Sequence, residues 1–287
     1  MTYQSDVTPL QRVLLRHARD AFLDPASVAA QWRGLGYLGP PDVDNACRES
    51  DRLGALLESM GVDVVWAPPT DTGLDSIYVR DAAVLCDGGN IRCRMGKEAR
   101  AREPAALAAT LSDLGVSQRG EVEAPGTLEG GDVTWLAPDW LAVGSGYRTN
   151  PRGIDRLREL VGDGVDVTVV PLPHWNGPGD VFHLMSVVSP LAEDLVLVYS
   201  PLLPVRFREL LLERGMGLVE VPGPEFGSMA CNVLAVAPRV AVALEGNPET
   251  RRRMEAAGVD VRLYRGMEIS VKGCGGPTCL TRPLERA

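Results

Sequence analysis

Along most of the chain, stretches with apolar residues at helical spacing alternate with short β-branched runs. Five times a helical stretch ends at a glycine and a strand-like run follows at once, over residues 56–66, 111–122, 157–170, 210–221 and 252–264. Glycine takes the left-handed conformation that ends a helix at little cost. The pattern therefore predicts five helix ends, at Gly61, Gly115, Gly164, Gly217 and Gly258.

These glycines lie 54, 49, 53 and 41 residues apart by subtraction, which indicates one architecture built from similar units. Further strands are predicted at 11–15, 77–85, 90–93, 133–136, 141–143, 181–189, 195–199, 232–237, 240–244 and 268–271. Closing five such units radially protects the sheet edges and brings the unit ends to one central site. An open α/β sheet is the alternative. No linker divides the chain, so we expect a single domain over residues 1–287.

Composition and charge narrow the class of protein. The 287 residues are 45% hydrophobic and 23% charged, which is enough for a sizeable core. A formal net charge of −9 and a pI near 5.0 disfavour nucleic acid and anionic membranes as partners, but are compatible with a small cationic ligand. No membrane span or secretory signal is expected. Six cysteines at irregular spacing indicate a reduced, cytoplasmic protein.

The most informative cysteine is Cys279, which closes the glycine-rich run 273–279 (GCGGPTC). Glycines allow backbone to approach a ligand closely, and an accessible thiolate is a nucleophile. The segment is therefore a candidate active-site loop. The alternative is that Cys279 is a small buried hydrophobe in a C-terminal strand.

Carboxylates and histidines supply the candidates for proton transfer. Glu129 and Asp132 flank a Gly-Gly pair just before a strand, where one of them can orient a histidine or act as a base. His183 lies in an apolar run and needs a partner there, either Glu129 or a backbone carbonyl. His174 lies in a polar loop as a lid or surface residue, and His17 is interpreted as structural.

Other charged residues are candidates for substrate contacts. Asp81 ends the run 75–81 next to Arg80, where it can face a pocket or form a surface ion pair. Arg100 and Arg148 lie in polar stretches after strands. Arginine forks match carboxylates, so either one can hold an amino-acid carboxylate or be a solvated charge.

The chain resembles the guanidine-modifying superfamily over about residues 10 to 285. The resemblance is carried by an ordered set of five motifs: YVRD (78–81), LEGGDV (128–133), YRTN (147–150), FHL (182–184) and GGPTC (275–279). This superfamily comprises dimethylarginine dimethylaminohydrolases, arginine deiminases and amidinotransferases. The resemblance implies the pentein fold, a five-bladed α/β propeller with pseudo-five-fold symmetry of strand-strand-helix-strand units. It also implies that Cys279 is the nucleophile, His183 the general acid/base and Glu129 the partner of that histidine.

The same resemblance implies the substrate contacts. Asp81 matches the acid that grips the guanidinium, Asp75 lies where a second polar contact is expected, and Arg100 and Arg148 match the arginines that hold the substrate carboxylate. Ser186 also belongs to the implied substrate site.

The run 183–186 (HLMS) is most similar to the dimethylarginine hydrolases, because deiminases and amidinotransferases carry an acid at the position of Met185. Cys274 lies where some relatives bear an acid that meets the substrate, so the identity of the substrate stays open.

The implied activity is hydrolysis at the guanidinium carbon of arginine or a methylated arginine. It proceeds through a covalent cysteine-thiouronium and gives citrulline, or a related ureido product, and an amine. No metal or cofactor is implied, and a homodimer is one open state of assembly. The alternatives are amidinotransfer, arginine deimination, and a non-catalytic pentein that binds a macromolecule.

Overall fold

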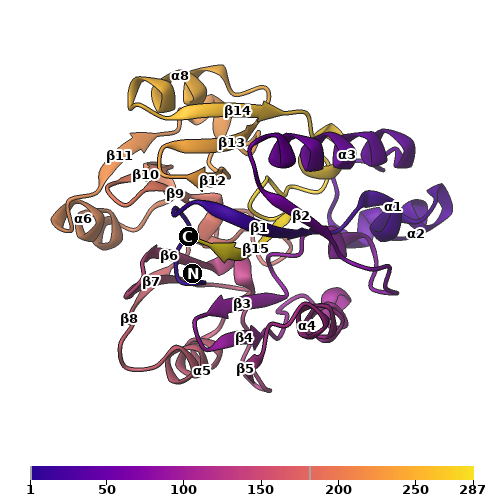
Figure 1. Ribbon diagram of the computed structural model, residues 1–287, viewed down its shortest axis with the longest axis horizontal. Helices are drawn as coiled ribbons and strands as arrows, with labels where there is room; N and C mark the ends of the chain where they lie inside the picture. The colour runs from indigo at the N-terminus through magenta and orange to yellow at the C-terminus, as the bar shows by residue number, and fades with distance from the viewer. Residues whose placement is uncertain (1, 181) are drawn as a thin grey trace.

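Five three-stranded sheets surround a common centre, with helices at the outside, in the computed structural model, which describes residues 2–180 and 182–287 (Figure 1). Four of the sheets are built from consecutive segments. In each of them two strands pair antiparallel as a hairpin, and a helix then leads to a third strand that pairs parallel to the second. The predicted five-unit propeller is therefore confirmed, and the open sheet is excluded.

The four consecutive units have the following bounds. The first is β3 (Ala83–Cys86), β4 (Gly89–Arg92), α4 (Glu103–Asp113) and β5 (Gln118–Glu121). The second is β6 (Val133–Ala137), β7 (Trp140–Ser145), α5 (Pro151–Val161) and β8 (Asp166–Pro171). The third is β9 (Val188–Ala192), β10 (Leu195–Val198), α6 (Val205–Glu213) and β11 (Gly217–Glu220), and the fourth is β12 (Leu234–Ala237), β13 (Val240–Leu244), α8 (Pro248–Ala256) and β14 (Asp260–Tyr264).

The fifth sheet joins distant parts of the chain. Its order is β15 (Thr281–Arg286), β1 (Leu10–Leu15) and β2 (Asp63–Trp66), with β15 antiparallel and β2 parallel to β1. Between β1 and β2 lie α1 (Ala18–Phe22), α2 (Pro25–Leu35) and α3 (Val43–Ser59). Pairing of β15 with β1 closes the ring and fixes the segment that immediately precedes β15.

Helix ends follow the glycine pattern, with two displacements. Gly61, Gly115 and Gly258 follow their helices with φ of +85°, +85° and +83°, as predicted. The helices α5 and α6 instead end at Gly162 (φ +87°) and Gly215 (φ +79°), two residues before the predicted Gly164 and Gly217. Where two glycines follow a helix closely, the first one takes the left-handed conformation, and Gly217 is left to begin β11.

Three predicted strands are wrong in whole or part. The run 77–85 is a strand only from Ala83, after the 3-10 helix η1 (Leu74–Ile77), and the run 268–271 lies in a π-helical turn, η6 (Met267–Val271). In the run 181–189, Val181 lies outside the described residues, and η4 (Leu184–Ser186) precedes β9. Side chains replace a strand partner in these runs: the Glu49 carboxylate accepts three successive N–H groups of η6, at 3.0, 2.8 and 3.1 Å.

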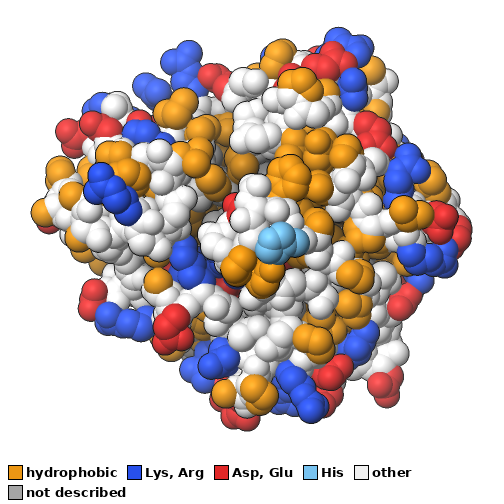
Figure 2. All heavy atoms as spheres, turned by 180° about the vertical axis from the view of Figure 1, so that it is seen from behind, with side chains coloured by type: hydrophobic (Ala, Val, Ile, Leu, Met, Phe, Trp, Pro, Cys, Tyr) orange, Lys and Arg blue, Asp and Glu red, His pale blue; other side chains and the backbone are white. Residues whose placement is uncertain are grey.

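The remaining short elements are η2 (Glu98–Arg100), η3 (Gly130–Asp132), η5 (Ser200–Leu202) and α7 (Gly223–Phe226). Among the described residues, every helix is too short or too polar to cross a bilayer. On the face opposite to that of Figure 1, hydrophobic side chains gather around the middle, and most charged side chains lie toward the edge (Figure 2).

Candidate active site

One cavity of about 260 Å³ brings the candidate nucleophile and the candidate acid/base together. Cys279 and His183 both line it, although they come from the segment before β15 and the segment before β9. Most of the remaining wall is apolar, from Leu38, Trp175, Phe182, Met185, Phe226 and Met229. The thiol therefore has access to a ligand, although Cys279 is only 8% exposed.

The loop that carries Cys279 is shaped by its glycines. A Cβ at Gly275 would lie 2.3 Å from the ring of Tyr78, and one at Gly276 would lie 2.4 Å from Oδ1 of Asn232. Both contacts are impossible for a side chain, so the glycines allow the loop to pack against these two residues. Asn232 in turn donates a hydrogen bond from Nδ2 to the sulfur of Cys279, at 3.3 Å.

The groups of the protein around Cys279 favour its thiol form. Burial, and then the nearby charge of Asp81, raise the pKa of Cys279 to about 11, although the hydrogen bond from Asn232 acts in the opposite direction. A positive charge brought beside the sulfur would lower this pKa, because it would offset both causes.

His183 is held by Glu129. Nε2 of His183 lies 2.8 Å from Oε2 of Glu129, and both residues are buried. Oε1 of Glu129 accepts the backbone N–H of Gly96 at 2.9 Å, and Nη1 of Arg148 lies 3.3 Å from Oε2. Glu129 is therefore the hydrogen-bond partner of His183, as predicted. Its carboxylate is held in position by Gly96 and Arg148.

The pKa values of His183 and Glu129 are shifted in opposite directions. Burial disfavours the imidazolium, but Asp81, Asp132 and Glu129 raise the pKa of His183 to about 9. Burial likewise disfavours the Glu129 carboxylate, but the hydrogen bond and charge of His183 lower the pKa of Glu129 to about 2. At neutral pH the pair is an imidazolium and a carboxylate, so His183 is a proton donor.

The Gly130-Gly131 pair explains how three functional groups come close together. A Cβ at Gly130 would lie 2.1 Å from the carbonyl oxygen of Arg80. A Cβ at Gly131 would lie 2.5 Å from Nδ1 of His183 and 2.6 Å from Oδ1 of Asp81. Any side chain at these positions would push the imidazole and the carboxylates apart.

Asp81 has one anchored oxygen and one unpartnered oxygen. Oδ2 accepts a hydrogen bond from Nη1 of Arg100 at 2.6 Å. Oδ1 is buried, lies 3.9 Å from Nδ1 of His183 and has no hydrogen-bond partner among the described residues. Asp81 itself is not among the described residues that line the cavity, but His183 next to it is. Since a buried carboxylate oxygen is rarely left without a donor, Oδ1 is the atom of Asp81 with an acceptor site free for an N–H group.

The structure gives Arg100 a different place from the one expected, which was on a substrate carboxylate. Its guanidinium is buried, and it donates to Glu103 at 2.9 and 2.7 Å, to Asp81, and to the carbonyl oxygens of Asp75 and Tyr78 at 3.2 Å. Each of its three nitrogens donates to a group of the protein, so Arg100 fixes the orientation of Asp81 and does not face a ligand.

Arg148 and Asp75 also have partners within the protein. Arg148 is buried against Glu129, and Asp75 accepts a hydrogen bond from Nζ of Lys97 at 2.9 Å. Neither of them, nor any other Lys or Arg, is among the described residues that line the cavity. Ser186 does line the cavity, while its Oγ also accepts the backbone N–H of His183 at 3.2 Å.

The structure also places the four residues whose roles the sequence left open or interpreted as structural. Met185 and Cys274 both line the cavity, and Cys274 has a φ of +59°. His174 lies outside the lining and bonds the hydroxyl of Tyr147 at 2.6 Å. His17 accepts the N–H of Arg19 as the cap of α1, which confirms its structural interpretation.

Two contributors were missed at the level of sequence. Asn232 is the one amide in the apolar run 229–237, a signal that was available but not used. Glu103, at the start of α4, carries nothing in its local sequence that distinguishes it from an ordinary exposed acid. Asp132, the other acid of the Gly-Gly run, does not bond His183 itself: its Oδ1 accepts the N–H of Leu184 at 3.0 Å, which fixes the turn after His183.

Asp81, Glu129 and His183 also offer ligand atoms within 4.8 Å of one another, a separation that one metal ion can bridge. A metal would have to displace the proton that His183 and Glu129 share. Since the pKa of His183 is raised to about 9, that competition is strongest at and below neutral pH.

The chain is similar to known proteins in sequence and in fold. The sequence model of a family described as arginine deiminase matches residues 75–210 and 203–286. The arginine deiminase of Rhodococcus erythropolis is 32% identical over 189 residues, which cover 55% of this chain and 46% of that protein. The chain thus spans about half the length of this relative.

A second relative is similar over most of its length. The N(G),N(G)-dimethylarginine dimethylaminohydrolase of Pseudomonas aeruginosa is 26% identical over 251 residues, which cover 85% of this chain and 91% of that protein. A solved structure of that enzyme, a cysteine-to-serine mutant complexed with citrulline, superposes with a TM-score of 0.77 over 95% of this chain and 98% of its own, at 23% identity.

The N-terminal domain of ArgZ, an arginine dihydrolase from cyanobacteria, was solved bound to substrate. It superposes with a TM-score of 0.82 over 96% of this chain and 98% of its own, at 18% identity. At these identities the two structural likenesses bear on the fold, and they confirm the pentein propeller.

Proposed function

The chain belongs to the arginine deiminase family, and from this membership and the geometry of the site we propose that it is a hydrolase of guanidino compounds that uses Cys279 as its nucleophile. The observation that carries the proposal is the convergence of three groups. The sulfur of Cys279 and the imidazolium of His183 line one cavity, and the unpartnered Oδ1 of Asp81 lies 3.9 Å from that imidazole.

In this mechanism the substrate activates its own nucleophile. A guanidinium held by Asp81 brings a positive charge beside Cys279. This charge lowers the pKa of the thiol from about 11, and the thiol proton leaves to solvent. Arg100 holds the other oxygen of Asp81, so the carboxylate is already oriented when the substrate arrives.

Bond exchange follows at the central guanidinium carbon. The sulfur of Cys279 forms a bond to this carbon, and the carbon-nitrogen bond to the departing amine breaks as the His183 imidazolium gives that nitrogen a proton. The product of this step is a covalent thiouronium and a neutral imidazole. His183 then takes a proton from water, and the hydroxide adds to the same carbon. As the carbon-sulfur bond breaks and restores the thiolate, the added hydroxyl loses its proton to the released amine through solvent, and the ureido product leaves. Glu129 stabilises each imidazolium form through its 2.8 Å contact.

We infer arginine or a methylated arginine as the substrate, with a ureido compound such as citrulline and an amine as products. The relatives named above act on arginine or dimethylarginine. Met185 in the cavity wall supports a methylated guanidinium, because its apolar side chain accommodates methyl groups and offers no acceptor for extra N–H donors. We infer no metal or cofactor, and a homodimer stays an untested state of assembly. The six free cysteines suit a cytoplasmic setting.

The first experiment is turnover of a substrate panel by the wild-type enzyme and by Cys279→Ser. The panel comprises arginine, monomethyl- and dimethylarginine, and agmatine, scored for ureido product. We expect Cys279→Ser to lose turnover by at least about 10³-fold with an unchanged Tm, since the hydroxyl is a far weaker nucleophile. Cys47→Ser is the matched control, because Cys47 is a free thiol on α3 outside the cavity. Retained turnover in Cys279→Ser would remove this residue as nucleophile.

The alternative functions are distinguished by different measurements. An amidinotransferase passes the amidino group to an amine, so ornithine or glycine would yield a new guanidino product in place of the ureido product. An arginine deiminase releases ammonia from unmodified arginine. A pentein that only binds a macromolecule would leave Cys279 without selective reactivity toward a haloacetamidine probe, read by mass spectrometry.

A further inference from the structure

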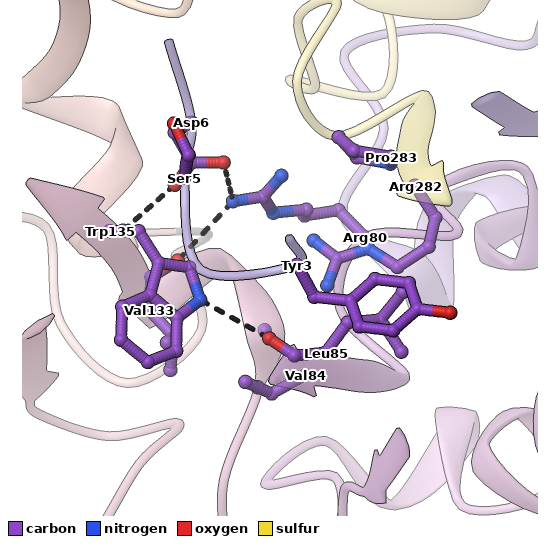
Figure 3. Close-up of a pocket in the computed structure, with 11 residues that line it drawn as sticks. Tyr3, Ser5, Asp6, Arg80, Val84, Leu85, Val133, Trp135, Arg282 and Pro283 are labelled. Carbon is purple, nitrogen blue, oxygen red and sulfur yellow. Dashed lines mark hydrogen bonds and ion pairs between the residues drawn. The ribbon is translucent and has the colours of Figure 1, made fainter. Parts of the chain in front are cut away.

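A second, much smaller cavity lies between the inner strands β3, β6 and β15 and the N-terminal segment (Figure 3). Its volume of about 10 Å³ leaves room for one small species. The guanidinium groups of Arg80 and Arg282 point into this space, and Asp6 and the ring of Tyr3 complete its polar and aromatic walls.

Positive charge exceeds negative charge around this cavity. Arg80, Arg282 and Arg286 are 3%, 5% and 1% exposed, and Asp6 is the carboxylate that faces them. Oδ1 of Asp6 accepts from Nη2 of Arg80 at 2.8 Å, and its Oδ2 accepts the N–H of Trp135 at 2.9 Å. Of the described residues that line the cavity, Arg80 and Arg282 carry positive charge and Asp6 alone carries negative charge.

A second acid acts on Arg282 from the active-site side. Asp81 acts on the pKa of Arg282, but its Oδ2 is bound to Arg100 on the active-site side. Burial and then the charge of Arg80 hold the pKa of Arg282 well below its usual range. The two guanidiniums therefore repel one another in a medium that screens poorly.

The guanidiniums also have unused donors. The Nε atoms of Arg80, Arg282 and Arg286 are buried and have no acceptor among the described residues. Arg282 uses Nη1 on the carbonyl oxygen of Ala83, at 3.0 Å, and this bond leaves its charge uncompensated. A buried charged donor without an acceptor is costly, and a buried cation without an anion more so.

We propose that this cavity binds a single monatomic anion of the size of chloride. Such an anion accepts hydrogen bonds from every side, so it can serve the donors of Arg80 and Arg282 at once and reduce their repulsion. The volume excludes phosphate, sulfate and carboxylate ligands, which are several times larger.

The position of the anion links it to the catalytic wall. Arg80 donates its backbone N–H to the carbonyl oxygen of Cys279 at 3.2 Å, while its side chain points into the small cavity. Three chain segments thus have an active-site residue on one side and an anion-cavity residue on the other: Arg80–Asp81, Glu129–Gly130 and Cys279–Arg282. An anion in the cavity braces the wall that carries the catalytic groups.

The test is thermal unfolding of the full chain in sodium chloride, in sodium bromide, and in sodium gluconate as the bulky reference, at constant ionic strength. We expect the halides to raise Tm saturably by about 2–4 °C, while gluconate does not. The rise should be absent in Arg282→Met and kept in Arg262→Met, because Arg262 is exposed and paired with Asp260. Equal responses to halide and gluconate, or a rise kept in Arg282→Met, would overturn the proposal.

Crystals of the wild-type protein grown in bromide keep the proposal testable if Arg282→Met does not fold. An anomalous bromine peak between Arg80 and Arg282 supports the anion. A water molecule there, without anomalous signal at bromide concentrations that saturate the thermal response, would show that the site takes a neutral occupant.

Discussion

Replacing Glu129 with Gln removes one charge from the centre of the site and keeps its shape. In the native protein the pKa of His183 rises from 6.5 to about 9, which corresponds to a preference for the imidazolium of about 3 kcal/mol. Asp81 and Asp132 provide a large part of this preference and stay in the variant. We therefore expect the pKa of His183 in Glu129→Gln to fall part of the way back toward 6.5.

The consequence for catalysis has a definite sign. The proposed acid is the imidazolium, so wild-type activity is lost as the pH rises through about 9, and activity of the variant is lost at lower pH. At pH 8 a full return of the pKa to 6.5 would lower the protonated fraction of His183 from about 0.9 to about 0.03, so we expect kcat/KM of Glu129→Gln to fall by roughly 3- to 30-fold. The pH dependence of kcat/KM on the best substrate of the panel measures both effects.

Stability has its own pH window. The raised pKa of His183 stabilises the fold fully below 6.5, and this contribution is lost as the pH rises to about 9. The lowered pKa of Glu129 stabilises it above 4.5, and this contribution is lost as the pH falls to about 2. Glu129 contributes to both shifts, so the difference in free energy of unfolding between wild type and Glu129→Gln should be widest between pH 4.5 and 6.5.

The titration of His183 can be observed directly by NMR, because the chain has three histidines and the Cε1–H signal is assigned by its loss in His183→Asn. The matched control is Glu249→Gln. Glu249 is paired with Arg252 and Arg253, which hold its pKa at about 2, but it is on the surface of α8 and does not contact His183. A variant at Glu129 that keeps a His183 pKa near 9 and a kcat/KM within twofold of wild type would refute the reasoning.

Three further substitutions test the site in other ways. Arg100→Met should lower the free energy of unfolding by about 3–5 kcal/mol in urea titrations, because it leaves two buried carboxylates without their cation. Gly131→Ala should lower kcat/KM by at least about 10²-fold, with a smaller change in Tm, because its Cβ would displace His183 from its position 2.5 Å away. Asn232→Ala should slow alkylation of Cys279 by iodoacetamide at pH 8 by roughly three- to tenfold, since the hydrogen bond that lowers the thiol pKa is removed.

Matched controls separate these effects from general damage. Gly34→Ala in α2 meets nothing within 4 Å, so it should leave both kcat/KM and Tm near wild type. An Arg100→Met protein as stable as wild type, or a fully active Gly131→Ala protein, would contradict the roles given to these residues. Unchanged alkylation in Asn232→Ala would mean that the amide does not tune the sulfur.

The fold was largely predictable because its signals are local and repeated. Three of the five helix ends fell on the predicted glycine, since one glycine follows each of those helices. At α5 and α6 two glycines compete, and which one takes the left-handed conformation depends on where the next strand begins to pair. The π-helical turn at 267–271 was not predictable, because it depends on the carboxylate of Glu49, more than 200 residues earlier.

The residues of the site were also predictable only where their signals are local. The Gly-Gly pair, His183 and Cys279 carry recognisable motifs, and their convergence agrees with the prediction. The sequence could not distinguish an arginine that faces a ligand from one that braces a carboxylate, since Arg100 would look the same in both cases. Its role depends on Glu103 and Asp81 packing around it, and these contacts exist only after the propeller closes.

The antiparallel pairing of β15 with β1 determines how the protein loses activity when it is heated. Cys279 lies two residues before this last strand, so the strand pairing that closes the ring also positions the sulfur. Local fraying that peels β15 away would retract the thiol while the four other sheets and their helices stay intact. On gentle heating, turnover should vanish before the far-ultraviolet circular dichroism signal changes, and cooling should restore it without global refolding.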